Sequence, residues 1–219
     1  MATAILAGGS GLVGGCVLRE LLADPAFTRV VAVGRRRLGV EHPKLVQVIA
    51  EFDALDQLDR PLQGDVAFCC LGTTLKRAGA AEAFRAVDHG AVLAFAWAVQ
   101  CGGVRSFFTV SALGADAGSR VFYNRVKGET EEALRVLGFA RLAIFRPGLL
   151  RGPRAEFRLG EKIGAVVLGA VGPLLRGRWR KYRSISAATV ARAMVRGAVD
   201  RRFAPSVPIE SDQIAELGR

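Results

Sequence analysis

The sequence has few of the residues that build metal sites and disulfide frameworks. Its two histidines, His42 and His89, show no metal-ligand spacing, and its four cysteines form no Cys-x-x-Cys pair. Cys69 and Cys70 are adjacent within an apolar run, so we interpret them as small buried hydrophobic residues in a reducing compartment. We therefore expect neither a metal site nor stabilising disulfides.

Segments that direct a chain into or across a membrane are also missing. No basic region followed by a long apolar segment stands at the N-terminus, where residues 1–3 lead straight into a short apolar run. The longest apolar run of the second half, residues 163–175, is too short to span a bilayer and is interrupted by glycines and a proline. These absences predict a cytoplasmic protein without a signal peptide.

Acidic residues are in deficit, with 20 Asp and Glu against 31 Lys and Arg and a formal net charge of +11. The excess is concentrated after about Arg141, with a dense run from Arg176 to Arg183. Nucleic-acid binders usually combine such charge with a recognised module or interleaved aromatics, and here only Trp179 and Tyr182 interleave. We expect no specific nucleic-acid partner and interpret the run as a solvated face. Weak contact with an anionic surface is the alternative.

Apolar runs alternate with helical patterns along the chain, which is long enough at 219 residues and 51% hydrophobic content for one α/β domain. Strands are predicted at 4–7, 29–33, 45–49, 65–71, 106–110 and 141–145. Helices are predicted at 12–23, 80–100 and 123–137, with a further helix opened by Ser186 and Thr189. This order predicts an α/β fold with a doubly wound parallel sheet. We expect a single domain, with a cofactor-binding core to about residue 150 and a smaller lobe over the strand ends at about 151–219.

The turn between the first strand and the first helix is the most informative stretch. Glycines recur at Gly8, Gly11 and Gly14, and together with Gly9 they form a Gly-x-Gly-x-x-Gly pattern. A pyrophosphate can approach such a backbone closely, and the helix that follows directs free N–H groups and its positive dipole end at the anion. The turn predicts dinucleotide binding, with a purely structural turn as the alternative. The predicted contacts are Gly8, Ser10, Gly11, Leu12, Val13 and Gly14.

The second predicted strand is followed by three arginines, Arg35, Arg36 and Arg37, with no acidic residue nearby. An NAD site usually carries an acidic residue here for the ribose 2′-hydroxyl, whereas an arginine pairs with a 2′-phosphate. We therefore expect Arg35 and Arg36 to bind NADP(H), with NAD the less favoured cofactor. A merely solvated loop is the alternative.

Two further strand ends complete the predicted cofactor site. Asp53, just past the third strand, is placed to meet the adenine amino group, and it could equally cap a short helix. After the fourth strand, Leu71, Gly72 and Thr73 are expected beside the pyrophosphate and ribose, because Gly72 allows close backbone approach.

Tyr123 and Lys127 are four residues apart, so on a helix both project from one face. An ammonium close to a tyrosine favours the phenolate, which lets the phenol act as an acid or base. Ser111 follows the fifth strand, where its hydroxyl could hold a substrate carbonyl oxygen, and Ser119 is a rival hydroxyl in a loop. These residues predict a catalytic group of Ser111, Tyr123 and Lys127. The alternative is a half-buried helix tyrosine and a surface lysine.

Together these motifs resemble the short-chain dehydrogenase/reductase superfamily. Three stretches are similar to its atypical branch, which includes the Tat-interacting oxidoreductase-like proteins: residues 65–74 followed by Val87-Asp88, Tyr123-x-x-x-Lys127-Gly128-Glu129, and Phe145-Arg146-Pro147-Gly148. The resemblance covers about residues 3–200. It implies a Rossmann fold, NADP(H) at the glycine turn, a Ser/Tyr/Lys reductase triad and Pro147 at the cofactor.

Two classes of function remain open at this point. One is an NADP(H)-dependent oxidoreductase acting on a small carbonyl or alcohol, and the other is a non-catalytic NADP(H) sensor or scaffold. The intact Ser/Tyr/Lys set counts against the second class, because a pure sensor needs no proton donor. Leu149, Leu150, Phe157 and Leu159 could line an apolar substrate pocket or be ordinary core residues. Homodimers are common in the superfamily, so a homodimer stays open here, but no particular residue of this sequence indicates one.

Overall fold

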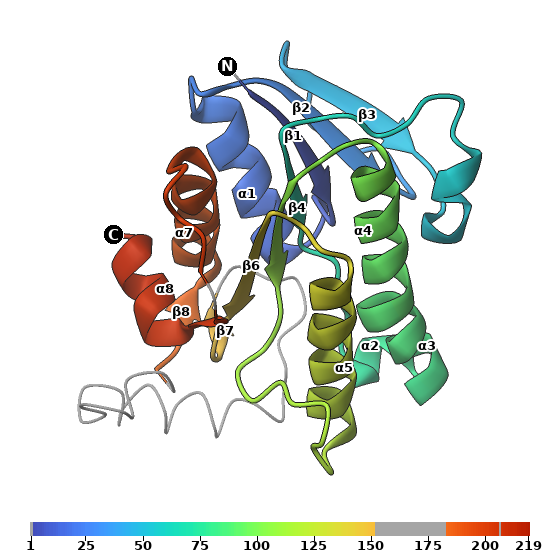
Figure 1. Cartoon of the computed structure of the whole chain (residues 1–219), viewed down its shortest axis with the longest axis vertical. Coiled ribbons are helices and arrows are strands. Elements are labelled where there is room, and N and C mark those ends of the chain that lie inside the picture. The colour runs from blue at the N-terminus through green and yellow to red at the C-terminus, as the bar shows by residue number, and fades with distance from the viewer. Residues whose placement is uncertain (1, 152–182, 206) are drawn as a thin grey trace.

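A seven-stranded parallel sheet forms the central layer of the computed structural model, which describes residues 2–151, 183–205 and 207–219 (Figure 1). The strand order is β3-β2-β1-β4-β5-β6-β9, and all neighbouring pairs are parallel. The strands are β1 (Ala2–Ala7), β2 (Phe27–Gly34), β3 (Leu45–Ile49), β4 (Val66–Cys69), β5 (Ser106–Val110), β6 (Arg141–Arg146) and β9 (Ile209–Glu210). This topology confirms the predicted α/β doubly wound sheet.

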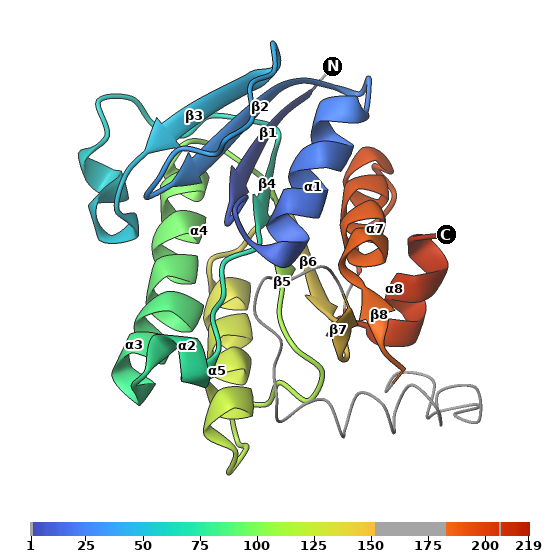
Figure 2. The same ribbon diagram turned by 180° about the vertical axis from the view of Figure 1, so that it is seen from behind.

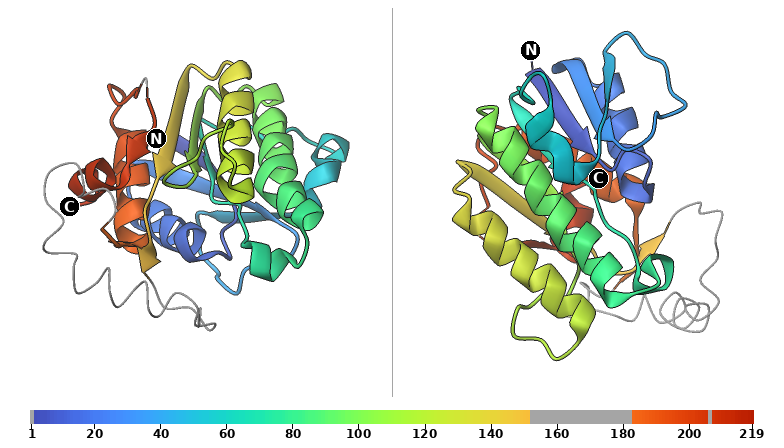
Figure 3. Two further views of the ribbon diagram at one scale, coloured as in Figure 1. Left: turned by 90° about the horizontal axis from the view of Figure 1, so that it is seen from below. Right: turned by 90° about the vertical axis from the view of Figure 1, so that its right-hand side faces the viewer.

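Helices cover both faces of the sheet. On one face α1 (Leu12–Ala23) packs against α7 (Ala187–Val199), and α8 (Ser211–Leu217) lies against α7 (Figure 2). On the other face α4 (Val92–Cys101) and α5 (Phe122–Val136) run side by side (Figure 3). The remaining elements are short: η1 (Phe52–Gln57), α2 (Leu75–Ala78), α3 (Ala81–Arg85), a π-helical turn η2 (Ala86–Ala91), and the parallel pair β7 (Leu150–Arg151) and β8 (Ile185–Ser186).

The core consists of two apolar layers, one on each face of the sheet. Because side chains alternate along a strand, Leu6 contributes to the layer under α1 and α7, while its neighbour Ile5 contributes to the layer under α4 and α5. Phe108 and Phe107 divide in the same way. Strands that are buried on both faces are continuous apolar runs, which is why the sequence predicted them well.

One predicted helix differs from the observed one, and one short strand of the central sheet was not predicted. The helix expected at 80–100 is continuous, but its middle turn is the π-helical η2, which inserts an extra residue and rotates the following turn. Ser186 caps α7 as expected, since its side chain accepts a hydrogen bond from the Thr189 backbone N–H. The strand β9 has only two residues and therefore carries no alternating pattern.

The C-terminal segment belongs to the layers of the sheet where the structure describes it, through α7, α8 and β9. Residues 152–182 lie outside the described residues, and with them Phe157, Leu159, the apolar run 163–175 and most of the basic run Arg176–Arg183. The smaller lobe over the strand ends therefore stays a prediction. Over the described ranges, no helix is both long and apolar enough to cross a membrane.

The aromatic cluster on the α1/α7 face gives a prediction for stability. Phe108 is fully buried, and its ring contacts those of Phe68, Phe145 and Phe203. We expect Phe108→Ala to lower the free energy of unfolding by about 3–5 kcal/mol, measured by urea denaturation, because the cavity cannot close around a rigid sheet. Val136→Ala is the control, since Val136 is 87% exposed and should change stability by less than about 0.5 kcal/mol. Equal effects of the two substitutions would contradict this packing.

Candidate functional site

The candidate site lies at the carboxyl ends of β1 and β4, which are neighbours in the centre of the sheet. The chain leaves β1 toward α1 on one face and leaves β4 toward the helices of the other face, so the two loops form a topological switch point of the sheet. The backbone N–H of Cys70 donates to the carbonyl of Ala7 at 2.9 Å and holds the two loops together. Ligands of doubly wound sheets bind at such a switch point.

Close backbone packing explains two of the three glycines in the first turn. Gly8 has a positive φ of 83°, and a Cβ there would lie 2.5 Å from the Cys70 carbonyl oxygen. A Cβ on Gly14 would lie 2.0 Å from the Gly8 carbonyl oxygen. Gly11 is the N-cap of α1, and no side chain among the described residues caps this helix start. The N-terminal N–H groups of α1 are therefore available to an anion.

The predicted adenine-side residues lie on the neighbouring strand ends. Arg35, Arg36 and Arg37 follow the end of β2 and are all exposed, and within the described ranges no carboxylate forms an ion pair with Arg35 or Arg36. Asp53 is exposed in the first turn of η1, whose N-cap is Glu51, so the capping alternative for Asp53 does not hold.

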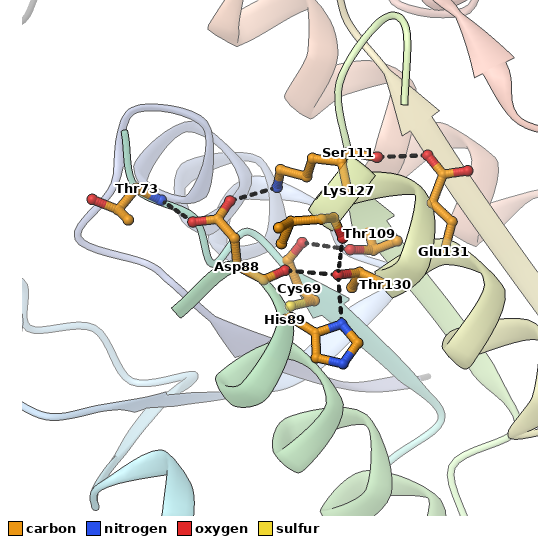
Figure 4. A network of polar contacts seen from close by, with 10 residues as sticks. Cys69, Thr73, Asp88, His89, Thr109, Ser111, Lys127, Thr130 and Glu131 are labelled. Atoms are coloured by element: carbon orange, nitrogen blue, oxygen red, sulfur yellow. Dashed lines mark hydrogen bonds and ion pairs between the residues drawn. The ribbon is translucent and has the colours of Figure 1, made fainter. Parts of the chain in front are cut away.

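Lys127 and Asp88 form a buried ion pair at the centre of the site (Figure 4). The Lys127 Nζ lies 2.8 Å from Asp88 Oδ1, and the side chains are 8% and 1% exposed. Asp88 Oδ2 accepts a hydrogen bond of 2.7 Å from the backbone N–H of Thr73, in the loop after β4. The predicted cofactor loop and the predicted catalytic lysine are thus joined by one carboxylate.

The ion pair determines the charge of the lysine. Burial of the ammonium by itself lowers the pKa of Lys127, but the carboxylate of Asp88, with smaller contributions from Tyr123 and Cys69, outweighs it. The pKa of Lys127 is therefore raised above its usual 10.5. Burial also raises the pKa of the neighbouring Cys69 thiol to about 11, in keeping with a small buried hydrophobic residue.

Tyr123 lies one turn before Lys127 on α5. It is half-buried, and its ring packs against Phe84 with a centroid distance of 5.4 Å. Because both residues lie in α5 and are four residues apart, their side chains project from the same helix face, as the spacing predicted. Pro147 is buried after β6, and its carbonyl accepts a hydrogen bond of 3.1 Å from Leu113 N–H.

Ser111 is held by a second buried carboxylate, Glu131. Its hydroxyl donates to Glu131 Oε1 at 2.6 Å, while Arg146 binds both carboxylate oxygens at 2.9 and 2.6 Å. These hydrogen bonds raise the pKa of Arg146, against the opposing effect of burial. Because a carboxylate only accepts, the single proton of Ser111 is committed to Glu131. The hydroxyl can donate to a substrate carbonyl only after it turns away from that partner.

The two carboxylates are the functional residues that were missing from the predicted site. Asp88 stood in the Val87-Asp88 motif but had no assigned role. Glu131 follows Lys127 by four residues, as Lys127 follows Tyr123, so the helical spacing could have found it. Nothing local in the sequence indicated that either carboxylate would be buried.

The hydrogen bonds among Ser111, Glu131 and Arg146 predict different losses of stability for substitutions of Glu131 and of Ser111. Glu131→Ala leaves the Arg146 guanidinium and the Ser111 hydroxyl without their common partner, so we expect a loss of about 3 kcal/mol in the free energy of unfolding. Ser111→Ala removes one donor and should cost only about 1 kcal/mol. Urea denaturation of both variants measures the difference. Equal losses would mean that the arginine does not depend on Glu131.

Sequence comparison identifies relatives that match most of the chain. No protein-family model matches the chain. It is 37% identical to the protein HTATIP2 of Rattus norvegicus over 216 residues, which are 97% of this chain and 87% of that protein. It is 32% identical to the mitochondrial protein fmp52 of Emericella nidulans over 200 residues, 84% of each chain.

The names of the fungal relatives correct one expectation. Relatives from Emericella nidulans, Aspergillus terreus and Coccidioides immitis are named mitochondrial proteins. The predicted cytoplasmic location is therefore wrong, because it was based only on the lack of a secretory leader and a membrane span.

Solved structures show the same fold at low sequence identity. A short-chain dehydrogenase/reductase family oxidoreductase from Burkholderia thailandensis superposes with a TM-score of 0.63 and 20% identity, over 97% of this chain and 92% of that one. The Bordetella bronchiseptica enzyme WbmH, solved in complex with NAD⁺, superposes with a TM-score of 0.66 and 18% identity, over 92% and 73%. The chain has the Rossmann fold of these proteins and, by its kinship with the rat protein, belongs to the HTATIP2 family.

Proposed function

We propose that this protein is an NADP(H)-dependent oxidoreductase that reduces a small carbonyl compound or oxidises the corresponding alcohol. The observation that carries the proposal is the charged, buried Lys127, one turn from Tyr123 and tied to the loop after β4. The loop after β4 packs against the glycine turn, since a Cβ on Gly8 would lie 2.5 Å from the Cys70 carbonyl oxygen, and no described side chain caps the start of α1. A proton donor and an anion site at one edge of a sheet are what a nicotinamide-dependent reductase requires.

The described residues fit the cofactor at three points. The turn from Gly8 to Gly14 would hold the pyrophosphate through backbone N–H groups, with Ser10, Leu12 and Val13 in the same turn. Arg35 and Arg36 would bind the 2′-phosphate, and Asp53 would meet the adenine. Leu71, Gly72, Thr73 and Pro147 would flank the nicotinamide half. The exposed and unpaired state of Arg35 and Arg36 supports the choice of NADP(H).

NADPH, when bound, supplies the hydride for the carbonyl carbon. Tyr123 donates the proton that the reduced oxygen needs. Lys127, one turn along α5 from Tyr123, keeps its ammonium charged through the ion pair with Asp88. The Ser111 hydroxyl orients the substrate oxygen after its side chain rotates and its hydrogen bond to Glu131 is broken.

The second candidate function is a non-catalytic NADP(H) sensor, and a specific observation favours it. Both expected helpers of Tyr123 are already committed, because Ser111 donates to Glu131 and Lys127 is paired with Asp88. A sensor would bind the coenzyme with the same turn and arginines, but it would turn over no substrate. Activity with a panel of aldehydes, ketones and quinones separates the two functions.

Substitution of the proton donor tests the enzymatic proposal. We expect Tyr123→Phe to reduce turnover with NADPH by about 10²–10⁴-fold, because it removes the acid, while NADPH affinity stays nearly unchanged. Turnover is followed by NADPH absorbance with whichever carbonyl the wild type accepts. Glu129→Gln, on the same helix but paired with Arg85 at the surface, is the control and should keep full activity. An active Tyr123→Phe variant would refute the assignment.

Substitution of the arginine loop tests the cofactor. We expect Arg35→Ala with Arg36→Ala to weaken NADPH binding by about 10–100-fold, since charge-assisted hydrogen bonds to the 2′-phosphate are lost. NADH binding should hardly change, so fluorescence titration with both coenzymes gives the answer. Arg29→Ala is a matched control, because Arg29 is an exposed arginine in the first half of β2. An equal loss for NADPH and NADH would show that the loop does not read the phosphate.

A further inference from the structure

Asp88 is a junction between three segments that are far apart in the sequence. Its carboxylate pairs with Lys127 of α5 and accepts from Thr73 N–H after β4. Its backbone carbonyl accepts a hydrogen bond of 3.1 Å from the hydroxyl of Thr130, also on α5. With 1% of its surface exposed, Asp88 has no solvent to replace any of these partners.

The local backbone around Asp88 departs from a regular helix. The helix from Ala81 to Cys101 passes through the π-helical turn η2, and Asp88 lies inside that turn. Such turns are uncommon and are concentrated at functional sites. The two carboxylate oxygens of Asp88 take different partners, so the residue holds the lysine and the loop at once (Figure 4).

We propose that Asp88 is a positioning residue that keeps Lys127 charged and joins it to the loop after β4, so that coenzyme binding depends on the Asp88–Lys127 pair. This inference rests on the proposed function, because it takes the loop at residues 71–73 to be part of the NADP(H) site. It goes beyond that function by giving a role to a residue that does not itself touch substrate.

The surroundings of the ammonium explain why Asp88 is needed. The groups that act on Lys127 are Asp88 from η2, Tyr123 from α5 and Cys69 from β4, and Asp88 is the strongest of the three. Burial alone opposes the charged form. Without the carboxylate, burial would lower the pKa of Lys127, so the ammonium would lose its proton at a lower pH than in the wild type.

The substitution Asp88→Asn separates the two roles of the carboxylate. The amide oxygen of asparagine still accepts from Thr73 N–H, whereas its NH₂ group offers nothing to an ammonium. Lys127 then titrates at a lowered pKa and becomes neutral as the pH rises through it. A residue that only stabilised the fold would change the stability but would not introduce a new titration into coenzyme binding.

The experiment measures NADPH affinity by fluorescence titration between about pH 5 and pH 9, because burial without a charged partner lowers the pKa of a lysine by up to about 3–5 units. Wild type should show no titration of Lys127 there. Asp88→Asn should bind like wild type at the lower end and about tenfold more weakly at the upper end. Lys127→Met should be uniformly weak, and adding Asp88→Asn to it should cause no further loss. Glu129→Gln, which removes a carboxylate from the same helix at the surface, should match wild type.

The outcomes distinguish this inference from the proposed function. A wild type that binds neither NADPH nor NADH would overturn both. A wild type that binds, with an Asp88→Asn variant whose pH profile matches it, would overturn only the role of Asp88. If Asp88→Asn alone fails to fold, the double variant Asp88→Asn with Lys127→Met tests the role of Asp88 instead, by comparison with Lys127→Met. The double variant contains no unpaired buried charge at these two positions. Binding much weaker in the double variant than in Lys127→Met would show that Asp88 does not act through the lysine.

Discussion

The junction between α5 and the loop after β4 depends on one buried ion pair, between Lys127 of α5 and Asp88 of the π-helical turn η2. An ammonium removed from water is costly unless a carboxylate compensates it, and the compensation requires both groups to be placed accurately. The same carboxylate binds the backbone at Thr73, so the position of the loop after β4 follows from the position of the lysine. The acid–base chemistry proposed for Tyr123 uses this arrangement.

Glu131 repeats the principle one turn further along α5. Tyr123, Lys127 and Glu131 follow each other at intervals of four residues, and the last two are tied to the ends of different strands at one edge of the sheet. Lys127 reaches the end of β4 through Asp88, and Glu131 reaches the ends of β5 and β6 through Ser111 and Arg146. Through these contacts the helix α5 fixes the positions of the strand ends where ligands of such sheets bind. This alignment also occupies the hydroxyl and the ammonium, which keeps a sensor as the competing function.

Much of this could be predicted from the sequence because the signals are local. Apolar runs indicated six of the seven strands of the central sheet, and the glycine turn indicated the switch point, since Gly8 and Gly14 tolerate no side chain there. The pairing of Tyr123 with Lys127 followed from helical spacing. Helical spacing placed Glu131 on the face of Tyr123 and Lys127, but the burial of Asp88 and Glu131 and their partners 15 to 39 residues away are set by tertiary packing and could not be predicted. For the same reason Ser111, chosen for its place after β5, was expected to face a substrate and instead faces Glu131.

We infer that a phosphorylated nicotinamide coenzyme lies across the ends of β1, β2 and β4. A crystal structure of the protein grown with NADP⁺ is the decisive measurement. We expect the pyrophosphate at the N-terminus of α1, the 2′-phosphate within hydrogen-bond distance of Arg35 or Arg36, and the nicotinamide ribose beside Lys127. No coenzyme density at saturating concentration, or a 2′-phosphate turned away from both arginines, would refute this inference.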